Sequence, residues 1–148
     1  MYNAINFYRM AHWLYLHHVP VLPKLFTLLI FLCYNSKIHY STEIGKGTKL
    51  AYGGMSVLIH QDCKIGKCCG IGAHVILGGG NHKYPGVPIL GDNVSIKANS
   101  VVYGGVKIGD NAVVGCNSVV NCDIPAGEIW AGAPARFIRK NDTNIKSY

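Results

Sequence analysis

Aliphatic residues recur at every sixth position through most of this 148-residue chain. They form three runs: Ile38, Ile44 and Leu50; Ile59, Ile65, Ile71 and Leu77; and Leu90, Ile96, Val102, Ile108, Val114 and Val120. A period of six matches neither the period of an α-helix nor the simple alternation of a long strand. It fits short strands that each end in a turn, three of which close one triangular coil. The repeat therefore predicts an all-β solenoid, in which each coil buries its inward side chains against its neighbours.

A second register supports the same fold. Four residues after most of the repeating aliphatics stands a small or β-branched residue, and the residue directly after them is often glycine. The first of these sets is Thr42, Thr48, Cys63, Cys69, Val75, Val94, Ser100, Val106, Ala112 and Ser118. Small side chains suit the narrow corners of a coil. Cys63 and Cys69 are therefore expected to be packing residues and not nucleophiles.

Cysteine usage and charge restrict the function classes. The chain has six cysteines, none at C-x-x-C spacing, and no secretory signal is evident, which predicts a cytoplasmic protein with reduced thiols. The formal charge of +7 favours anionic partners. No surface of clustered Lys and Arg with exposed aromatics is indicated, so nucleic-acid binding is not expected.

Residues 1–37 follow a different pattern, which predicts helices. Phe7, Met10, Trp13, Leu14 and His17 fall near one side at helical spacing, and Pro20 and Pro23 then interrupt the chain. The apolar stretch 24–34 is shorter than the roughly 20 residues that a membrane span needs. We expect a helical segment packed on the main domain or on a partner subunit, with contact to a membrane surface as the functional alternative. The predicted organisation is a helical segment (1–37), a β-helix (38–135) and a C-terminal tail (136–148).

The repeat is broken twice. Leu50 and Ile59 are nine residues apart instead of six, and Leu77 and Leu90 are thirteen apart, which predicts a loop at about 81–89. Insertions in a solenoid are extruded as loops, often on the binding face. Counting three hexads per coil places Ile38, Ile59, Leu77, Val102 and Val120 on one face of the solenoid. His39, His60 and His82 are then expected near one edge, with His82 at the root of the loop.

The motifs of this region resemble the left-handed β-helix acyltransferases, and among them the serine acetyltransferase group. The resemblance covers roughly 38–140 and rests on the segments 38–47 (IHYSTEIGKG), 52–60 (YGGMSVLIH), 77–80 (LGGG), 87–94 (VPILGDNV) and 132–138 (GAPARFI). It implies a left-handed parallel β-helix that assembles as a homotrimer, with acetyl-CoA as co-substrate in the groove between two subunits. It also implies that a histidine removes the proton of a small hydroxyl acceptor, which attacks the thioester directly.

The expected site residues follow from this resemblance. Gly78 and Gly79 suit close backbone approach to the thioester, and basic side chains are expected to meet the CoA phosphates. The candidate cofactor-binding residues are Gly78, Gly79, Lys97, Ala98, Arg136 and Lys140, with Arg139 a further basic candidate. No metal site is assigned.

One departure from the family pattern concerns the catalytic pair. Metabolic serine acetyltransferases carry an Asp-His pair in the first break, where this chain has Ala51 and Tyr52. His60 is the best replacement base, and His82 is second and could act across the trimer interface. Tyr52, with an ordinary pKa of about 10, is a poor base and is expected to orient the acceptor.

Four functions stay open at this point. The first is acetyl transfer to serine. The second is acetyl transfer to a sugar hydroxyl in surface polysaccharide synthesis, which the Ala51-Tyr52 departure favours. The third is an inactive trimeric scaffold. The fourth is a metal enzyme of the γ-carbonic anhydrase type, which needs three convergent histidines; no His-x-x-x-x-His spacing occurs in the repeat region.

Overall fold

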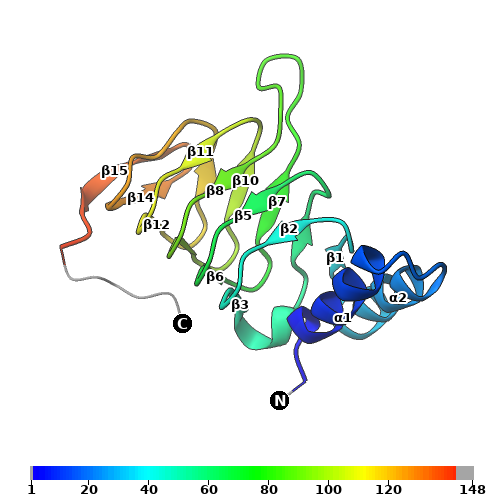
Figure 1. Ribbon diagram of the computed structural model, residues 1–148. Helices are drawn as coiled ribbons and strands as arrows, with labels where there is room; N and C mark the ends of the chain where they lie inside the picture. Colours follow the sequence, from blue (N-terminus) through cyan, green and yellow to red (C-terminus); the bar gives the residue numbers. More distant parts are fainter. Residues whose placement is uncertain (1, 143–148) are drawn as a thin grey trace.

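The computed structural model describes residues 2–142 and shows two helices followed by a stack of short strands (Figure 1). The helices are α1 (Ala4–Leu16) and α2 (Leu22–Tyr34), and a short 3₁₀ turn, η1, spans Ala51–Gly54. The strands of the first two coils are β1 (Lys37–Ile38), β2 (Glu43–Ile44), β3 (Lys49–Leu50), β4 (Leu58–Ile59), β5 (Lys64–Ile65) and β6 (Gly70–Ile71). Those of the next two are β7 (Ile76–Gly78), β8 (Ile89–Leu90), β9 (Ser95–Ile96), β10 (Val101–Tyr103), β11 (Lys107–Ile108) and β12 (Val113–Val114). The last strands are β13 (Val119–Val120), β14 (Glu128–Gly132) and β15 (Ala135–Lys140).

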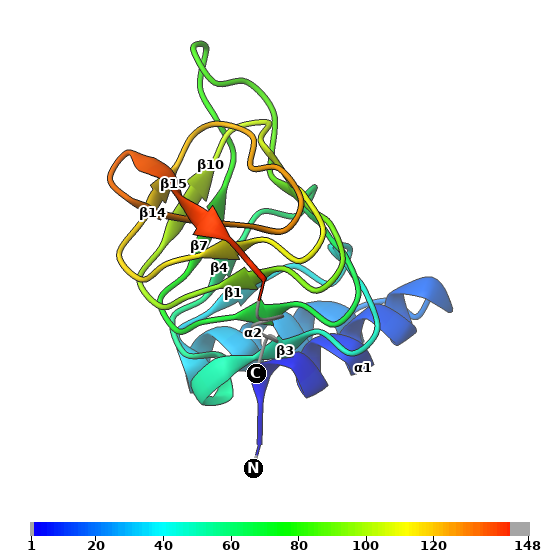
Figure 2. The same cartoon turned by 90° about the vertical axis from the view of Figure 1, so that its left-hand side faces the viewer.

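The strands stack into three parallel sheets, one for each side of the coil. The first face is β1-β4-β7-β10-β13, the second is β2-β5-β8-β11, and the third is β3-β6-β9-β12-β14-β15. Within the first face Ile38 pairs with Ile59 and Ile59 with Leu77, which is the register that the hexad count predicts. Viewed from its C-terminal side, the stack is a triangular shaft (Figure 2). The left-handed parallel β-helix with a short helical segment is therefore confirmed.

The repeating aliphatics fill the shaft and the small residues fill its corners. Cys63 and Cys69 are almost fully buried, as expected of packing residues, and burial raises the pKa of the Cys63 thiol to about 11. The glycines after the aliphatics permit the stacking itself. A Cβ on Gly66 would lie 2.3 Å from the carbonyl oxygen of Gly91 in the next coil, which is closer than any real contact.

The two helices cover the open end of the first coil. The Tyr8 hydroxyl donates to the carbonyl of Thr42, and the Arg9 guanidinium donates to the carbonyls of Ile44 and Gly45, both at 2.6 Å. A terminal coil has no preceding coil to donate hydrogen bonds to its carbonyls, so the helical hairpin supplies the missing donors. Tyr8 is fully buried, and this burial raises its pKa to about 12.

The C-terminal segment differs from the expected tail. Residues 136–140 belong to β15, which runs antiparallel to β14, while residues 143–148 lie outside the described part of the chain. The last coil would otherwise leave β14 as an unpaired edge, and β15 supplies its hydrogen bonds. Within residues 2–142, neither helix is both long and apolar enough to cross a bilayer.

Candidate active site

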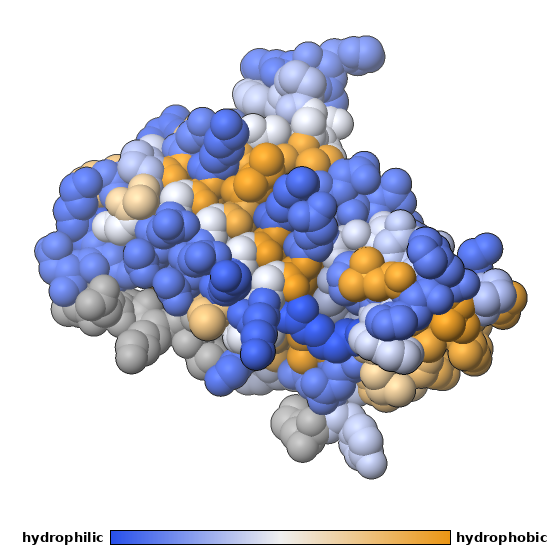
Figure 3. Space-filling view, in the orientation of Figure 1, coloured by the Kyte–Doolittle hydropathy of each residue, from blue (hydrophilic) through white to orange (hydrophobic). Residues whose placement is uncertain are grey.

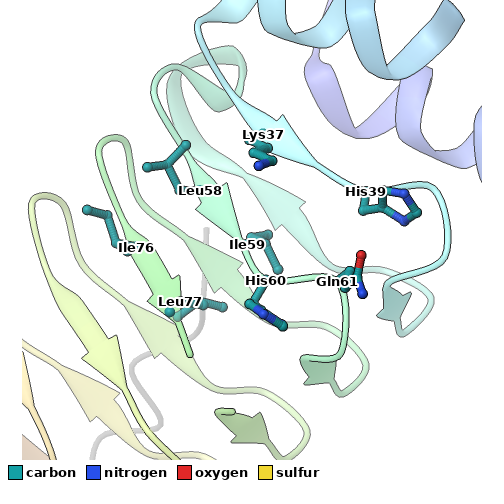
Figure 4. Close-up of a pocket in the computed structure, with 9 residues that line it drawn as sticks. Lys37, His39, Leu58, Ile59, His60, Gln61, Ile76 and Leu77 are labelled. Carbon is teal, nitrogen blue, oxygen red and sulfur yellow. The ribbon is translucent and has the colours of Figure 1, made fainter. Parts of the chain in front are cut away.

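A groove of about 280 Å³ opens on the first face of the β-helix, near its helical end (Figure 4). It is lined by Lys37, His39, Leu58, Ile59, His60, Gln61, Ile76, Leu77 and Gly78. Lys37, Leu58 and Ile76 are the outward residues that precede the buried aliphatics of β1, β4 and β7. The polar members follow the ends of the same strands. The groove therefore lies along the edge where the first face turns into the second, here called the first-second edge.

His39 and His60 reach this edge for the same structural reason. Each follows a buried isoleucine, and these two isoleucines are paired in adjacent coils. The backbone N–H of His60 donates to the carbonyl of Leu77 at 2.9 Å, which fixes the backbone at the turn. The hexad count therefore places these two histidines together correctly, and both line the groove.

The two imidazoles have equivalent partners two residues further on. His39 Nδ1 lies 2.7 Å from Ser41 Oγ, and His60 Nδ1 lies 3.3 Å from the backbone N of Asp62. The Asp62 carboxylate is 3.7 Å from His60 Nδ1, which is longer than a hydrogen bond but close enough for attraction. In both rings Nδ1 is thus within hydrogen-bond distance of a residue in the turn that follows the histidine.

The outer edge of the His60 ring lies beside Gly79. A Cβ built on Gly79 would be 3.4 Å from His60 Cδ2 and 3.6 Å from Nε2. In the structure Nδ1 accepts the backbone N–H of Asp62, which leaves the ring hydrogen on Nε2. For Nε2 to take a proton, the ring hydrogen must move to Nδ1, where the Asp62 carboxylate at 3.7 Å is the side chain that would favour it. The geometry gives His60 an accessible Nε2, a nearby carboxylate and a neighbouring glycine at which substrate can approach.

His39 has a lowered pKa. Burial is the main cause and the Lys37 ammonium the second, while the Asp62 carboxylate opposes them. The neutral imidazole is therefore the dominant form of His39 near pH 7. Its position in the groove suits a hydrogen bond to the substrate that accepts the acetyl group.

His82 does not join the other two histidines within one subunit. It lies in the loop between β7 and β8 that projects from the β-helix (Figure 1), and it does not line the groove. The backbone N–H of Gly80 donates to Gly86 at 2.9 Å, which closes the base of the loop and places His82 in its tip. The loop base is also held by Gly105, whose N–H donates to Pro85 at 2.8 Å. The expectation that His82 lies at the root of the loop is therefore wrong. The hydrogen bonds of Gly80 and Gly105 close the loop on either side of His82 and place it in the projecting tip.

Tyr52 lies at the opposite edge of the first face, where the third face turns into the first. The extra residues of the first break form η1, and Tyr52 adopts a left-handed φ of 52° inside it. Its side chain is 69% exposed and does not line the groove. The two breaks thus leave from different edges, here the third-first edge and the first-second edge. Within one subunit Tyr52 and His60 do not share a site.

The candidate cofactor residues divide among three places. Gly78 and Gly79 lie at the groove. Lys97 and Ala98 follow β9 on the third-first edge, where a Cβ on Gly72 would lie 2.5 Å from Ala98 N. The remaining two, Arg136 and Lys140, lie on β15 at the far end of the shaft.

Lys140 already has a partner in the structure. Its Nζ lies 2.6 Å from Glu128 Oε1, and this hydrogen bond is the main reason why the pKa of Glu128 is lowered. Arg136 is exposed, and its Nη1 donates to the carbonyl of Ala135 at 3.0 Å. Arg136 is therefore better placed than Lys140 to meet a phosphate.

Sequence reasoning missed two polar groove residues, Lys37 and Gln61, and also Asp62, whose carboxylate lies beside His60. The hexad register could have predicted Lys37, because the residue before each inward aliphatic of the first face points outward. Asp62 could have been found from the turn after His60, where a side chain two residues on can reach back to the ring. In the described part of the chain, no three His, Cys, Asp or Glu side chains converge as a metal site would need.

Comparison with known proteins identifies the family. Residues 88–122 match the family model described as bacterial transferase hexapeptide (six repeats). The serine acetyltransferase of Synechococcus elongatus is 34% identical over 145 residues, which are 97% of this chain and 59% of that protein. The serine acetyltransferase of Helicobacter pylori strain J99 is 33% identical over 140 residues, covering 94% of this chain and 81% of that protein.

Solved structures agree in fold. Soybean serine acetyltransferase complexed with serine has a TM-score of 0.81 at 34% identity, over 91% of this chain and 56% of that one. A serine acetyltransferase complex with CoA has a TM-score of 0.81 at 27% identity, over 91% and 55%. The chain thus spans little more than half the length of the solved proteins that it matches. Because the Helicobacter relative is matched over most of its own length, the chain belongs to the serine acetyltransferase family of hexapeptide-repeat β-helix proteins.

Proposed function

We propose that this protein transfers an acetyl group from acetyl-CoA to the hydroxyl of a small acceptor, with serine as the leading acceptor. The observation that carries the proposal is His60, whose Nε2 lies in the groove on the first face beside Gly79. Membership in the serine acetyltransferase family supports the reaction type. The relatives' complexes with serine and with CoA support the two substrates.

The proposed step needs one base and one oxyanion site. His60 Nε2 takes the proton of the acceptor hydroxyl while its oxygen attacks the thioester carbonyl carbon. The tetrahedral intermediate then collapses, the carbon–sulfur bond breaks, and the CoA thiolate takes the proton back from the imidazolium. Backbone N–H groups of the Gly78–Gly79 segment are the candidate donors to the developing oxyanion.

A homotrimer would complete this site. His82, Tyr52 and Lys97 do not line the groove of their own subunit. In a trimer with CoA between two β-helices, they are candidates to reach the groove of a neighbour, where His82 would be a second base and Tyr52 would orient the acceptor. Sedimentation of the purified protein at three times the chain mass would support this assembly, and a monomer that is fully active would contradict it.

A sugar hydroxyl is the second candidate acceptor. Ala51 and Tyr52 replace the Asp-His pair of the metabolic enzymes, and the first-face groove is lined mostly by apolar area beside Lys37 and two imidazoles. This lining offers apolar contact and hydrogen bonding to a larger acceptor than serine. The cysteine spacing, with no C-x-x-C pair, favours a reducing, cytoplasmic compartment for either reaction.

The test is release of free CoA, measured with a thiol reagent, in the presence of serine or of nucleotide-linked and lipid-linked sugars. Serine-dependent release supports the leading proposal, and sugar-dependent release alone supports the second. Equal release with and without every acceptor would contradict acetyl transfer. Calorimetric titration with CoA distinguishes a wrong acceptor panel, in which CoA still binds, from an inactive scaffold, in which it does not.

A further inference from the structure

Helix α2 is apolar on the side that faces away from the protein. Its inner side holds the buried residues Pro23 and Ile30. The opposite side carries exposed Leu25, Leu28 and Leu32, spaced three or four positions apart, and exposed Leu22 and Phe31 lie at its two flanks. A helix on the surface of a soluble protein normally turns polar residues outward, and a helix that is apolar on both sides is normally covered. We call this outward row the α2 leucine face.

Helix α1 extends this surface. Met10, Trp13 and Leu16 are exposed on α1, and the Trp13 ring stacks on His17 with centroids 4.0 Å apart. Figure 3 shows hydrophobic surface in the region of the helical hairpin. Tryptophan and leucine together are the side chains typical of helices that lie at a bilayer interface.

The charge around this surface has one sign. No Asp or Glu occurs before Glu43, and the charged residue of α2 is Lys24. Lys24 is exposed on α2 at the flank of the leucine face. Two hairpins packed face to face would bring like charges together with no acid to pair them. An anionic lipid surface complements both the apolar row and the basic flank.

We infer that the α1–α2 hairpin docks on the surface of an anionic phospholipid membrane, with the α2 leucine face lying in the interface. Neither helix is long enough to span the bilayer, so the contact is peripheral and reversible. This docking is independent of the acetyl-transfer chemistry. The hairpin holds the first coil through its inner side, so its outer side is available without any change in fold.

The experiment is sedimentation of the full chain with phosphatidylcholine vesicles, alone or mixed with phosphatidylglycerol. We expect sedimentation with the mixed vesicles and much less with the neutral ones, and added salt should reduce it. The double variant L25Q/L32Q should lower the apparent affinity for mixed vesicles by about tenfold or more. Both leucines are well exposed, at 48% and 68%, so this change removes apolar surface without opening the core.

Two controls keep the result interpretable. Ile138→Gln changes a residue that is 56% exposed on β15, at the other end of the shaft, and should leave vesicle binding unchanged. Trp13 fluorescence should shift to shorter wavelength on vesicle addition, and the shift should vanish in W13F. Wild-type protein that stays in the supernatant with both vesicle types would overturn the inference. The inference would also be overturned if, without lipid, the wild-type protein formed a larger assembly than the L25Q/L32Q variant. The α2 leucine face would then join copies of the chain.

Discussion

The two edges of the first face are built alike but have different chemistry. Each receives an insertion, η1 on the third-first edge and the 79–88 loop on the first-second edge. The family places its Asp-His pair on the former, where this chain has Ala51 and Tyr52. The groove with His39 and His60 lies on the latter. Because the inward residues and the strand pairing hold the shaft together, the edges can differ in chemistry while the core stays constant.

The largest expected effect is that of His60→Ala, which tests whether the first-second edge carries the catalytic base. His60→Ala should lower kcat/KM by about 10²–10⁴-fold, because it removes the proposed base. The side chain is exposed, so the β-helix and its assembly state should stay unchanged by circular dichroism and sedimentation. Unchanged turnover would remove His60 from the mechanism and would favour a site on the third-first edge.

The glycine beside the imidazole gives the next effect. Gly79→Val should lower kcat/KM by about tenfold, since its methyl groups would crowd the Nε2 edge of His60 and displace the acceptor. Gly79→Ala is the matched control, because its single Cβ makes ordinary contacts of 3.4 Å and 3.6 Å with the ring. Equal activity of the Val and Ala variants would show that substrate does not approach along this side.

Asp62→Asn should have a smaller effect. The carboxylate lies 3.7 Å from His60 Nδ1 and is exposed, so solvent screens its attraction. We expect kcat to fall by less than about tenfold, because the carboxylate that would favour a hydrogen on Nδ1 is lost but the base remains. Asp62→Glu should recover part of the loss in steady-state assays. A full loss in D62N would mean that the carboxylate moves closer in the working enzyme.

Tyr52→Phe tests the other edge. Tyr52 is exposed and outside its own groove, so loss of its hydroxyl should change kcat/KM by about twofold or less in the absence of a contribution from a neighbouring subunit. A KM that rises severalfold while kcat is constant would instead place Tyr52 against the acceptor across a trimer interface. The two edges would then act as one composite site.

The smallest effect concerns the titration of His39, followed by NMR. Its midpoint should lie below the ordinary pKa of 6.5, and Lys37→Gln should raise it only partly, because burial is the larger cause. Since the unfolded chain binds this proton first as pH falls, His39 lowers stability as pH drops through 6.5 and not above it. A midpoint that does not change in K37Q would show that the ammonium does not face the ring.

The sequence predicts the shaft well because its determinants are local. Each aliphatic such as Ile59 faces inward as a consequence of the period alone, and the period also places His39 beside His60. The loop tip was misplaced because the Gly80–Gly86 and Pro85–Gly105 hydrogen bonds join residues outside the repeat. The strand β15 was missed for a related reason, since its partner is the edge of β14 and the hexad does not continue there. Long-range closure of insertions and ends is what a periodic pattern does not encode.

The hairpin cap also sets a length scale. Coils stack at about 4.8 Å, and His39 and His60 belong to the first and second coils, so the groove begins within about 10 Å of the capped end. With the hairpin held at a lipid surface, the groove would lie within reach of hydroxyls carried on lipid head groups. Insertion of one extra coil between α2 and His39 would raise the groove by one strand spacing. The number of coils between the hairpin and the groove would then determine which acceptors the groove can reach, according to their height above the bilayer.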